Sequence, residues 1–266
     1  MQTLCDEFCS HESHPFIYKL NSTERKYIQT VAHCNIYMDG KYDFSKEIIL
    51  SDLIKALDDH FAKNPSNEYF LRLNKLSPKD AYYFMNDVDG EEDAVMTVDT
   101  IKRDIEYLHV SRSTGKMSEH CINVLLHSDR VYCEIAFDDD ESTELSVLLL
   151  NYVSVNYKTE TRCYVHCGKL VAISQYYCDL TNTYDDPECV ANLIEKIFNE
   201  KLRHLTKLES FVFDVYFDVK NEVQLIEFNP FNHATDPCLF TWNELEALNT
   251  NIFRYKFNND VISVEF

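Results

Sequence analysis

The stretch FVFDVYFDVKNEVQLIEFNPF, residues 211–231, decides the fold that the sequence predicts. Two runs within it, residues 211–219 and 222–229, are rich in the aromatic and β-branched side chains that are typical of strands. Lys220 and Asn221 separate the runs, so the pattern predicts a β-hairpin with a two-residue or four-residue turn. Both turns give the same register, in which Asp214 lies directly opposite Glu227.

One face of this hairpin carries polar groups and the other is apolar, because side chains alternate between the faces of a strand. Asn229 shares the face of Glu227 and lies near Asp214. The other face is expected to lie in the core and carries Phe213, Val215, Phe217, Ile226 and Phe228. The hairpin therefore brings two carboxylates and one amide to the same polar face.

Two carboxylates directly opposite each other in a hairpin repel. A divalent cation between them would offset the repulsion, and two carboxylates with one amide oxygen suit Mg²⁺ bound together with nucleotide phosphates. The pattern thus predicts Asp214, Glu227 and Asn229 as metal ligands. A structural alternative stays open, in which Glu227 lies at the sheet edge and Asp214 accepts a hydrogen bond from a neighbouring loop.

The composition indicates a soluble protein with a large core. The chain has 266 residues, of which 45% are hydrophobic, enough for one large domain or two lobes. It contains no apolar run of membrane-spanning length and no secretory leader pattern, so we expect a cytoplasmic protein that binds no membrane. The ten cysteines are scattered and are expected to be free thiols.

Charge and glycine content exclude several classes of function. The net charge of −20 argues against tight nonspecific nucleic-acid binding. The acidic runs at 86–99 and 138–144 are either solvated loops or a surface for a basic protein partner. Only four glycines occur, with no GxGxxG and no GxxxxGK[ST] motif, so a Rossmann site or a P-loop is excluded. Any nucleotide must be held in another way.

The rest of the chain mixes predicted strands and helices, which indicates an α+β fold. Helices are expected at 51–64, 99–109, 118–127, 187–205 and 241–248, and strands at 68–74, 131–137, 145–153, 161–167, 169–175 and within 252–266. A further helix is expected to begin at Ser77 as the N-cap, with Pro78 in its first position and Asp80 in a capping box.

The junction at residues 72–80 has the features of a phosphate site at the start of a helix. Arg72 and Asn74 share one face of the predicted strand, and Lys79 falls in the first helical turn. A cation there opposes the helix dipole unless an anion is bound. A solvated Lys79 is the alternative. Arg162, in a later strand, could pair with Glu160 or lie on an exposed face.

Three segments together resemble the cell division cycle protein 123 family: LRLNKLSPKDA (71–81), ETRCYVHCGKLVAISQ (160–175) and FDVYFDVKNEVQLIEFNPFNHATDPCLFTWNEL (213–245). The resemblance runs from about residue 65 to 248, and the third segment is its most specific part. It implies an ATP-grasp-like fold of two lobes, whose antiparallel sheets enclose a nucleotide cleft. The lobes are expected at 1–145, with the phosphate-binding junction, and at 146–266, with the nucleotide pocket and the metal-binding hairpin.

The resemblance implies ATP and Mg²⁺ as cofactors. The family's metal ligands fall on Asp214, Glu227 and Asn229, and Glu227 stands where Asp is usual. The expected cofactor-binding residues are Arg72, Asn74, Ser77, Lys79, Arg162 and Gln175. Arg72 replaces the family's phosphate-binding lysine, Tyr176 replaces an arginine, and the region around Leu150 diverges.

The family's role implies an assembly chaperone, acting as a monomer, that binds the gamma subunit of translation initiation factor 2 and is connected with the cell cycle. A second interpretation is an ATP-grasp RNA ligase, the one case in which RNA is a partner, with Lys75 or Lys79 carrying AMP. A third is a binding module that has lost ATP, for which Arg72, Leu150 and Tyr176 are the supporting departures.

Overall fold

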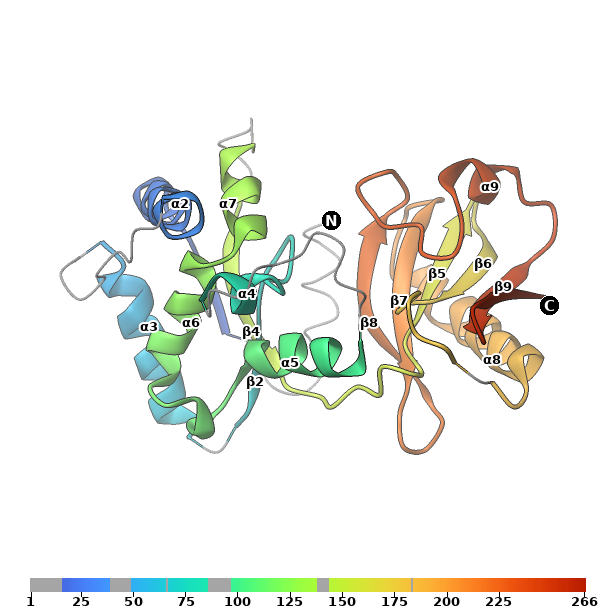
Figure 1. Ribbon diagram of the computed structural model, residues 1–266, viewed down its shortest axis with the longest axis horizontal. Helices are drawn as coiled ribbons and strands as arrows, with labels where there is room; N and C mark the ends of the chain where they lie inside the picture. The colour runs from blue at the N-terminus through green and yellow to red at the C-terminus, as the bar shows by residue number, and fades with distance from the viewer. Residues whose placement is uncertain (1–15, 39–48, 66, 86–96, 138–143, 183) are drawn as a thin grey trace.

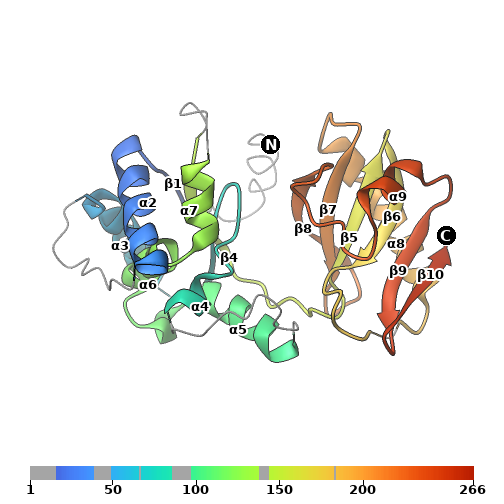
Figure 2. The ribbon, with the colours of Figure 1, turned by 45° about the horizontal axis from the view of Figure 1, so that its top comes forward.

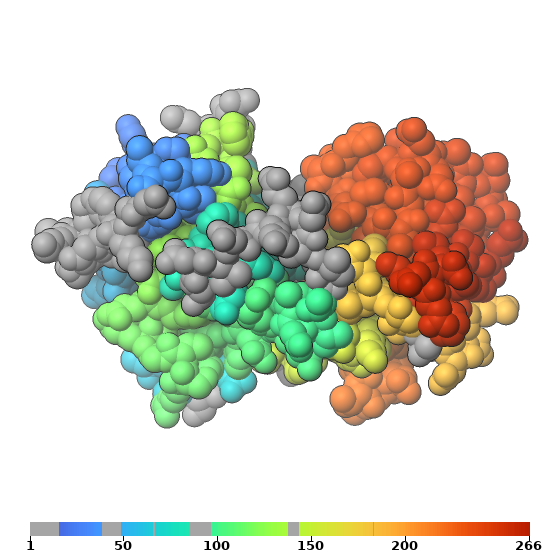
Figure 3. All heavy atoms as spheres, in the orientation of Figure 1, coloured from blue at the N-terminus to red at the C-terminus, as the bar shows by residue number. Residues whose placement is uncertain are grey.

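The chain forms two lobes, each built on its own sheet (Figure 1). The computed structural model describes residues 16–38, 49–65, 67–85, 97–137, 144–182 and 184–266. The acidic runs expected as loops or as a partner surface fall mostly outside these ranges. In the space-filling view the lobes lie side by side, and the green part of the first lobe lies against the yellow part of the second (Figure 3). The expected α+β class, with two lobes and mainly antiparallel sheets, is confirmed.

The first lobe holds a four-stranded antiparallel sheet of order β1-β4-β2-β3. Its strands are β1 (Phe16–Lys19), β2 (Tyr69–Leu73), β3 (His109–Val110) and β4 (Ser146–Asn151). Its helices are α2 (Ser22–Tyr37), α3 (Ser51–Lys63), α4 (Ala81–Met85), α5 (Val98–Leu108), α6 (Met117–Leu126) and α7 (Asp129–Ala136), with a short 3₁₀ turn η2 (Arg112–Thr114). Alternate β2 side chains, Leu71 and Leu73, are fully buried in one core with Leu53 and Leu57 of α3.

The second lobe holds a six-stranded sheet of order β10-β9-β6-β5-β7-β8. Its strands are β5 (Thr161–His166), β6 (Lys169–Gln175), β7 (Phe211–Phe217), β8 (Val223–Pro230), β9 (Ile252–Phe257) and β10 (Asp260–Glu265). Its helices are α8 (Pro187–Glu200), the 3₁₀ turn η3 (Leu202–His204) and α9 (Trp242–Ala247). The pair β6 and β9 is parallel, and the other neighbouring strands are antiparallel.

The two faces of the second sheet have different roles (Figure 2). Phe198 of α8 packs against Phe213 of β7 on one face. Trp242 of α9 packs against Tyr164 of β5 on the other. Asp214 follows Phe213 along β7 and therefore lies on the α9 face, because neighbouring side chains on a strand point to opposite faces.

The first sheet extends further along the chain than the expected lobe boundary. β4 pairs with both β1 and β2, so the chain of the first sheet continues beyond residue 145 and ends at Asn151. Four consecutive residues of β4, from Ser146 to Leu149, are buried, as expected of a strand between two others. The second lobe therefore begins with the segment that leads into β5.

The strand expected at 131–137 is wrong, because residues 131–136 lie in α7 (Asp129–Ala136) and Phe137 is its C-cap. Ser128 caps this helix by accepting a hydrogen bond from the Val131 amide at 3.2 Å. Val131 packs in the core of the first lobe, so tertiary contacts outweigh the strand preference of this short segment. The elements β1 and α2 were not predicted, although Asn21 and Glu24 form the capping box that opens α2.

The helix start expected at Ser77 is also wrong, because α4 begins at Ala81. The Asp80 carboxylate does not complete a capping box there. It accepts hydrogen bonds from the Ser128 hydroxyl at 2.6 Å and from the Arg130 amide at 3.0 Å. Asp80 therefore stabilises the N-terminus of α7, a helix that lies some fifty residues further along the chain.

The hairpin of β7 and β8 has the predicted pairing of Asp214 with Glu227, but a different register near the turn. Val215 pairs with Leu225, so one extra residue lies in β8 between Leu225 and Glu227, as a bulge. A shift of one residue exchanges the faces of a strand, so Val223 and Leu225 pack against the α8-side core in the place expected for Ile226.

Candidate functional site

The centre of the candidate site is a buried ion pair between neighbouring strands. Arg162 of β5 lies directly opposite Asp214 of β7. Its Nε and Nη2 donate to the two carboxylate oxygens of Asp214, each at 2.8 Å, and the two side chains are 7% and 1% exposed. The third guanidinium nitrogen, Nη1, donates to the Asp236 carbonyl at 3.0 Å. The two parallel hydrogen bonds from Nε and Nη2, called the guanidinium fork below, fix the Asp214 carboxylate in the plane of the guanidinium.

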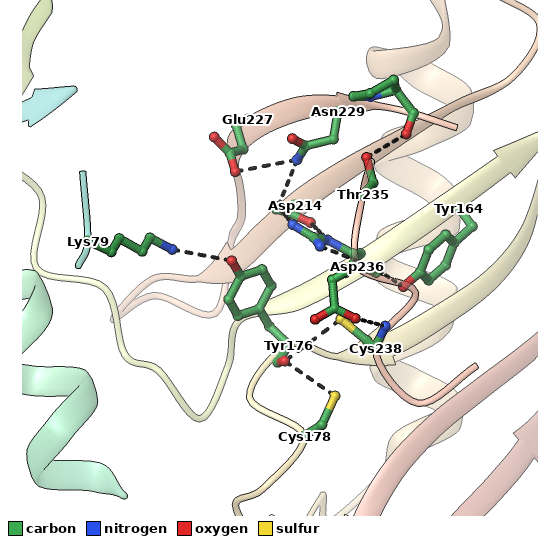
Figure 4. A network of polar contacts seen from close by, with 12 residues as sticks. Lys79, Tyr164, Tyr176, Cys178, Asp214, Glu227, Asn229, Thr235, Asp236 and Cys238 are labelled. Carbon is green, nitrogen blue, oxygen red and sulfur yellow. Dashed lines mark hydrogen bonds and ion pairs between the residues drawn. The ribbon is translucent and has the colours of Figure 1, made fainter. Parts of the chain in front are cut away.

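The predicted ligand set converges at this pair (Figure 4). The Asn229 amide nitrogen donates to Asp214 Oδ2 at 3.1 Å and lies 3.4 Å from Glu227 Oε1. The structure therefore brings the three predicted side chains, from β7 and β8, together, with the Asn229 amide within hydrogen-bond distance of both carboxylates.

Two contacts join the lobes at the site. Arg72 of β2 donates from Nη1 to Glu227 Oε2 of β8 at 2.8 Å. Lys79, which precedes α4, donates from Nζ to the Tyr176 hydroxyl at 3.2 Å. Arg72 and Lys79 were predicted as phosphate ligands, and both point from the first lobe to the polar residues of the second.

Tyr176 lies between two cations. Its ring centroid is 4.8 Å from the guanidinium carbon of Arg162 and 5.2 Å from Lys79 Nζ. Cation–π attraction and the hydroxyl contact together hold the ring in this position. The family resemblance implied an arginine at this position, and in this chain Tyr176 supplies a ring and a hydroxyl there.

Burial and neighbouring charges shift the pKa of each carboxyl group at the site. Burial raises the pKa of Glu160 to about 7. Burial also raises the pKa of Asp214 to about 6, although Arg162 opposes the shift. Burial would raise the pKa of Glu227 too, but Arg72 and Lys79 outweigh it and lower that pKa to about 2. At neutral pH, Glu227 is therefore fully ionised, whereas Glu160 is close to its midpoint.

Two of the predicted cofactor-binding side chains bind the backbone instead. The Asn74 amide donates to the Glu144 carbonyl at 2.9 Å and accepts from the Ser146 amide at 3.0 Å. The Gln175 amide donates to two carbonyls of the following segment at 2.6 and 2.7 Å and accepts from the Lys256 amide at 3.0 Å. Both side chains therefore hold loops next to the site.

The other predicted positions divide between the site and its surroundings. Ser77 is buried, and its carbonyl accepts from the Lys79 amide at 2.9 Å, so it shapes the loop that carries Lys79. Lys75, one of the two lysines considered for a ligase, forms an ion pair with Glu134 of α7 at 2.7 Å. Of the two lysines, only Lys79 contacts the site.

Tyr164 and Asp236 were not predicted to lie at the site, and Glu160 was considered only as an ion-pair partner of Arg162, which pairs with Asp214 instead. Glu160 is buried immediately before β5, where its charge acts on Lys79. The Tyr164 hydroxyl lies 3.5 Å from the Asp236 carbonyl that also accepts from Arg162. Alternation along β5 would have placed Glu160, Arg162 and Tyr164 on one face, and this is the signal that could have identified them.

The ligand set fits a hard divalent cation in its chemistry. Asp214, Glu227 and Asn229 supply two carboxylates and one amide oxygen. In the structure the amide nitrogen of Asn229 faces both carboxylates, and rotating the amide by half a turn would direct its oxygen to the same place. In the described ranges no group of three or more His, Cys, Asp or Glu residues has a metal-binding arrangement, so a cation here would rest on two acids, the amide and phosphate or water oxygens.

Comparisons with known sequences agree with this fold. The sequence model of the D123 family matches residues 39–264. A protein of Xenopus laevis named "Translation initiation factor eIF2 assembly protein" is 36% identical over 121 residues, which are 43% of this chain and 34% of that protein. The "Cell division cycle protein 123" of Candida glabrata is 35% identical over 114 residues, 40% of this chain and 30% of that one. The match thus spans about a third of the length of these curated relatives.

A solved structure has the same fold. The structure of Cdc123 from Schizosaccharomyces pombe superposes with a TM-score of 0.61 over 88% of this chain and 85% of that chain, at 24% sequence identity. The two-lobed α+β architecture is therefore shared. Because the family match covers most of its length, the chain belongs to the D123 family, the family of cell division cycle protein 123.

Proposed function

We propose that this protein binds ATP with Mg²⁺ where its two lobes meet, and that it acts as an assembly chaperone for translation initiation factor 2. Relatives carry the name of eIF2 assembly proteins, which supports the second part. The first part rests on two cations of one lobe that reach polar groups of the other. Arg72 donates to the Glu227 carboxylate at 2.8 Å, and Lys79 donates to the Tyr176 hydroxyl at 3.2 Å.

The charges at the site support a phosphate ligand with a cation. Arg72, Lys79 and Arg162 stand against the carboxylates of Asp214, Glu227 and Glu160. Arg72 and Lys79 come from loops and strands of the first lobe, so they can turn from Glu227 and Tyr176 towards phosphate oxygens. Arg162 is held by Asp214 and Asp236 and would keep its orientation.

When bound, Mg²⁺ would neutralise phosphate charge, and Asp214, Glu227 and Asn229 would hold it. Glu227 is the carboxylate best prepared for this, because it is fully ionised and would regain a positive partner when Arg72 turns to phosphate. Asp214 is kept in place by the guanidinium fork, so it needs no rearrangement to face the ion.

The ligase alternative would need Lys79 as its nucleophile. The Tyr176 phenol and the nearby carboxylates of Glu160 and Glu227 raise the pKa of Lys79, which keeps the amine protonated. A protonated amine is not a nucleophile. We therefore propose ATP binding without a lysine adenylate. Labelling with α-phosphate-labelled ATP tests this, since a covalent adduct lost in Lys79→Ala would support the ligase.

The proposed protein partner is the gamma subunit of translation initiation factor 2. The formal net charge of −20 gives this chain a long-range attraction for a basic surface. We expect a monomer in the cytoplasm that engages the subunit while ATP holds the two lobes together. Among the described residues, no helix combines the length and the apolar character that crossing a bilayer requires.

A pull-down with the recombinant gamma subunit tests this proposal. With Mg²⁺ and ATP, the intact protein should capture the subunit, and Asp214→Ala should lose most of the capture. Glu222→Ala is the matched control, because it removes an exposed acid from the turn of the same hairpin. Equal capture by the intact protein and by Asp214→Ala would contradict a role of this site in partner binding.

A further inference from the structure

Two cysteines lie on either side of one carbonyl group beside the site (Figure 4). The Cys178 thiol lies 3.5 Å from the Tyr176 carbonyl oxygen and 3.6 Å from that of Gln175. The Cys238 thiol lies 3.8 Å from the same Tyr176 oxygen. The neighbouring Cys178 thiol, together with burial, raises the pKa of the Cys238 thiol. The two sulfurs are therefore neighbours, although they are far apart in sequence.

The backbone holds each cysteine in a defined position. Cys178 follows β6 in a turn closed by a hydrogen bond from the Leu180 amide to the Tyr177 carbonyl at 3.1 Å. Cys238 lies between β8 and α9 with a φ of 54°, and its amide donates to Asp236 Oδ1 at 2.8 Å. The next amide, of Leu239, donates to the Ser174 hydroxyl at 3.2 Å and ties this loop to β6.

The surroundings of this pair differ from those of a cysteine that only fills a core. Cys121 and Cys163 have no exposed surface and pack in the cores of the two lobes. Cys178 and Cys238 are half-buried, and both thiols face polar atoms. A small oxidant can therefore reach them, and both thiols lie against the same Tyr176 oxygen.

We propose that Cys178 and Cys238 form a disulfide when the protein meets a peroxide. Because the pKa of the Cys238 thiol is raised, Cys178 is the cysteine that attacks first. Its thiolate attacks the peroxide, whose O–O bond breaks, and the sulfur becomes a sulfenic acid as the other oxygen leaves as hydroxide. The second thiol then attacks the sulfenic sulfur and releases water. The peroxide takes up two electrons, and the protein loses two hydrogens in total.

The disulfide would join the two segments that hold Arg162. The Tyr176 ring stacks on the guanidinium, and the Asp236 carbonyl accepts from its Nη1 at 3.0 Å. Cys178 and Cys238 each lie two residues from one of these contacts. The oxidised protein therefore keeps Arg162, and with it Asp214, in the orientation described here, and the loop between β8 and α9 can no longer move away from β6.

Peptide mapping of the folded protein after treatment with hydrogen peroxide tests the proposal. We expect a peptide pair linked through Cys178 and Cys238, and joint protection of both thiols from alkylation that is reversed by a reducing agent. Cys178→Ser should abolish the linked pair. Cys189→Ser is the matched control, because it removes an exposed thiol from α8 and should leave the linked pair intact.

The wild-type alkylation pattern decides the matter even if Cys178→Ser does not fold. If the two thiols are oxidised independently to sulfinic acids, or if either pairs mainly with another cysteine, the proposal is wrong. A second readout is thermal unfolding, whose midpoint should rise on oxidation and return on reduction. Neither readout needs ATP, so a failure of the proposed nucleotide binding would be distinguishable from a failure of the disulfide.

Discussion

Arg162 holds both carboxylate oxygens of Asp214 at 2.8 Å across two neighbouring strands, and both side chains are almost fully buried. This pair sets the position of the metal-ligand candidates, because Asn229 in turn donates to Asp214. The structural alternative expected Asp214 to accept a hydrogen bond from a neighbouring loop. Asp214 accepts instead from Arg162 of β5 and Asn229 of β8. Oδ2 of Asp214 accepts from both Arg162 and Asn229, whereas Oδ1 accepts only from Arg162. Oδ1 therefore keeps a lone pair that can face a cation.

Removing the guanidinium should destabilise the protein strongly. Arg162→Ala leaves Asp214 buried without a counter-charge, which typically lowers the free energy of unfolding by about 3–5 kcal/mol. Chemical denaturation measures this difference. Arg203→Ala, at an exposed position beyond α8, is the control and should change stability by less than about 0.5 kcal/mol. Equal stability of the two variants would show that the fork does not stabilise the lobe.

Removing the Tyr176 hydroxyl tests the contact between the lobes. Tyr176→Phe keeps the ring between Arg162 and Lys79 but removes the acceptor that Lys79 now uses, at a cost of about 1–3 kcal/mol in stability. Because phosphate and phenol compete for the same ammonium group, we expect tighter binding of Mg-ATP in this variant. Calorimetry on both proteins measures it, and weaker binding by Tyr176→Phe would show that the hydroxyl assists the nucleotide.

Glu160 should make stability depend on pH near neutrality. Its pKa is about 7 in the folded protein against an ordinary 4.5, so the folded state holds this proton more tightly than the unfolded state does. The stabilisation is complete below the unfolded pKa and is lost as pH rises through 7. From about pH 6 to about pH 8 the free energy of unfolding should fall by about 1 kcal/mol from this group.

Glu160→Gln should remove this component, because the amide resembles the protonated acid. Denaturation at both pH values measures the slope for the wild type and the variant. The same slope in both proteins would assign the pH dependence to another group, of which Asp214, with a pKa of about 6, is the next candidate.

Gln175 should affect structure before it affects ligand binding. Gln175→Ala removes two donated hydrogen bonds and one accepted bond from buried backbone groups, so we expect a loss of about 2–4 kcal/mol in stability. Intact variant protein should still bind Mg-ATP, because the Gln175 amide is occupied by the backbone. A large loss of Mg-ATP affinity in a folded variant would show that Gln175 contributes to the nucleotide pocket after all.

The sequence predicted the central hairpin because its signal is local. Strand composition and the position of Lys220 and Asn221 were sufficient for the pairing of Asp214 with Glu227. The bulge between Leu225 and Glu227 could not be predicted, since it depends on how β8 packs against α8. Near the turn the pairing differs by one residue from the predicted register, and the extra residue of the bulge restores it. The predicted pairing of Asp214 with Glu227 is therefore correct.

Contacts between distant segments account for the parts that sequence analysis missed. The residues of α7 have a preference for strands. They form a helix because Ser128 donates to Asp80 at its start and because the helix packs in the core of the first lobe. In the same way, the Asn74 and Gln175 amides find backbone partners about seventy to eighty residues away. No local pattern reports such partners, so the strand face of Asn74 and the family resemblance at Gln175 led to their assignment to the cofactor.

Titration of the protein with ATP in the presence of Mg²⁺, followed by calorimetry, tests the central claim most directly. The wild type should bind, and removal of Mg²⁺ should weaken the binding. Asp214→Asn, which keeps the size of the side chain and removes its charge, should lose most of the affinity, whereas Glu222→Gln should match the wild type. Wild-type affinity in Asp214→Asn, or no binding by the wild type at all, would contradict a Mg-ATP site at Asp214, Glu227 and Asn229.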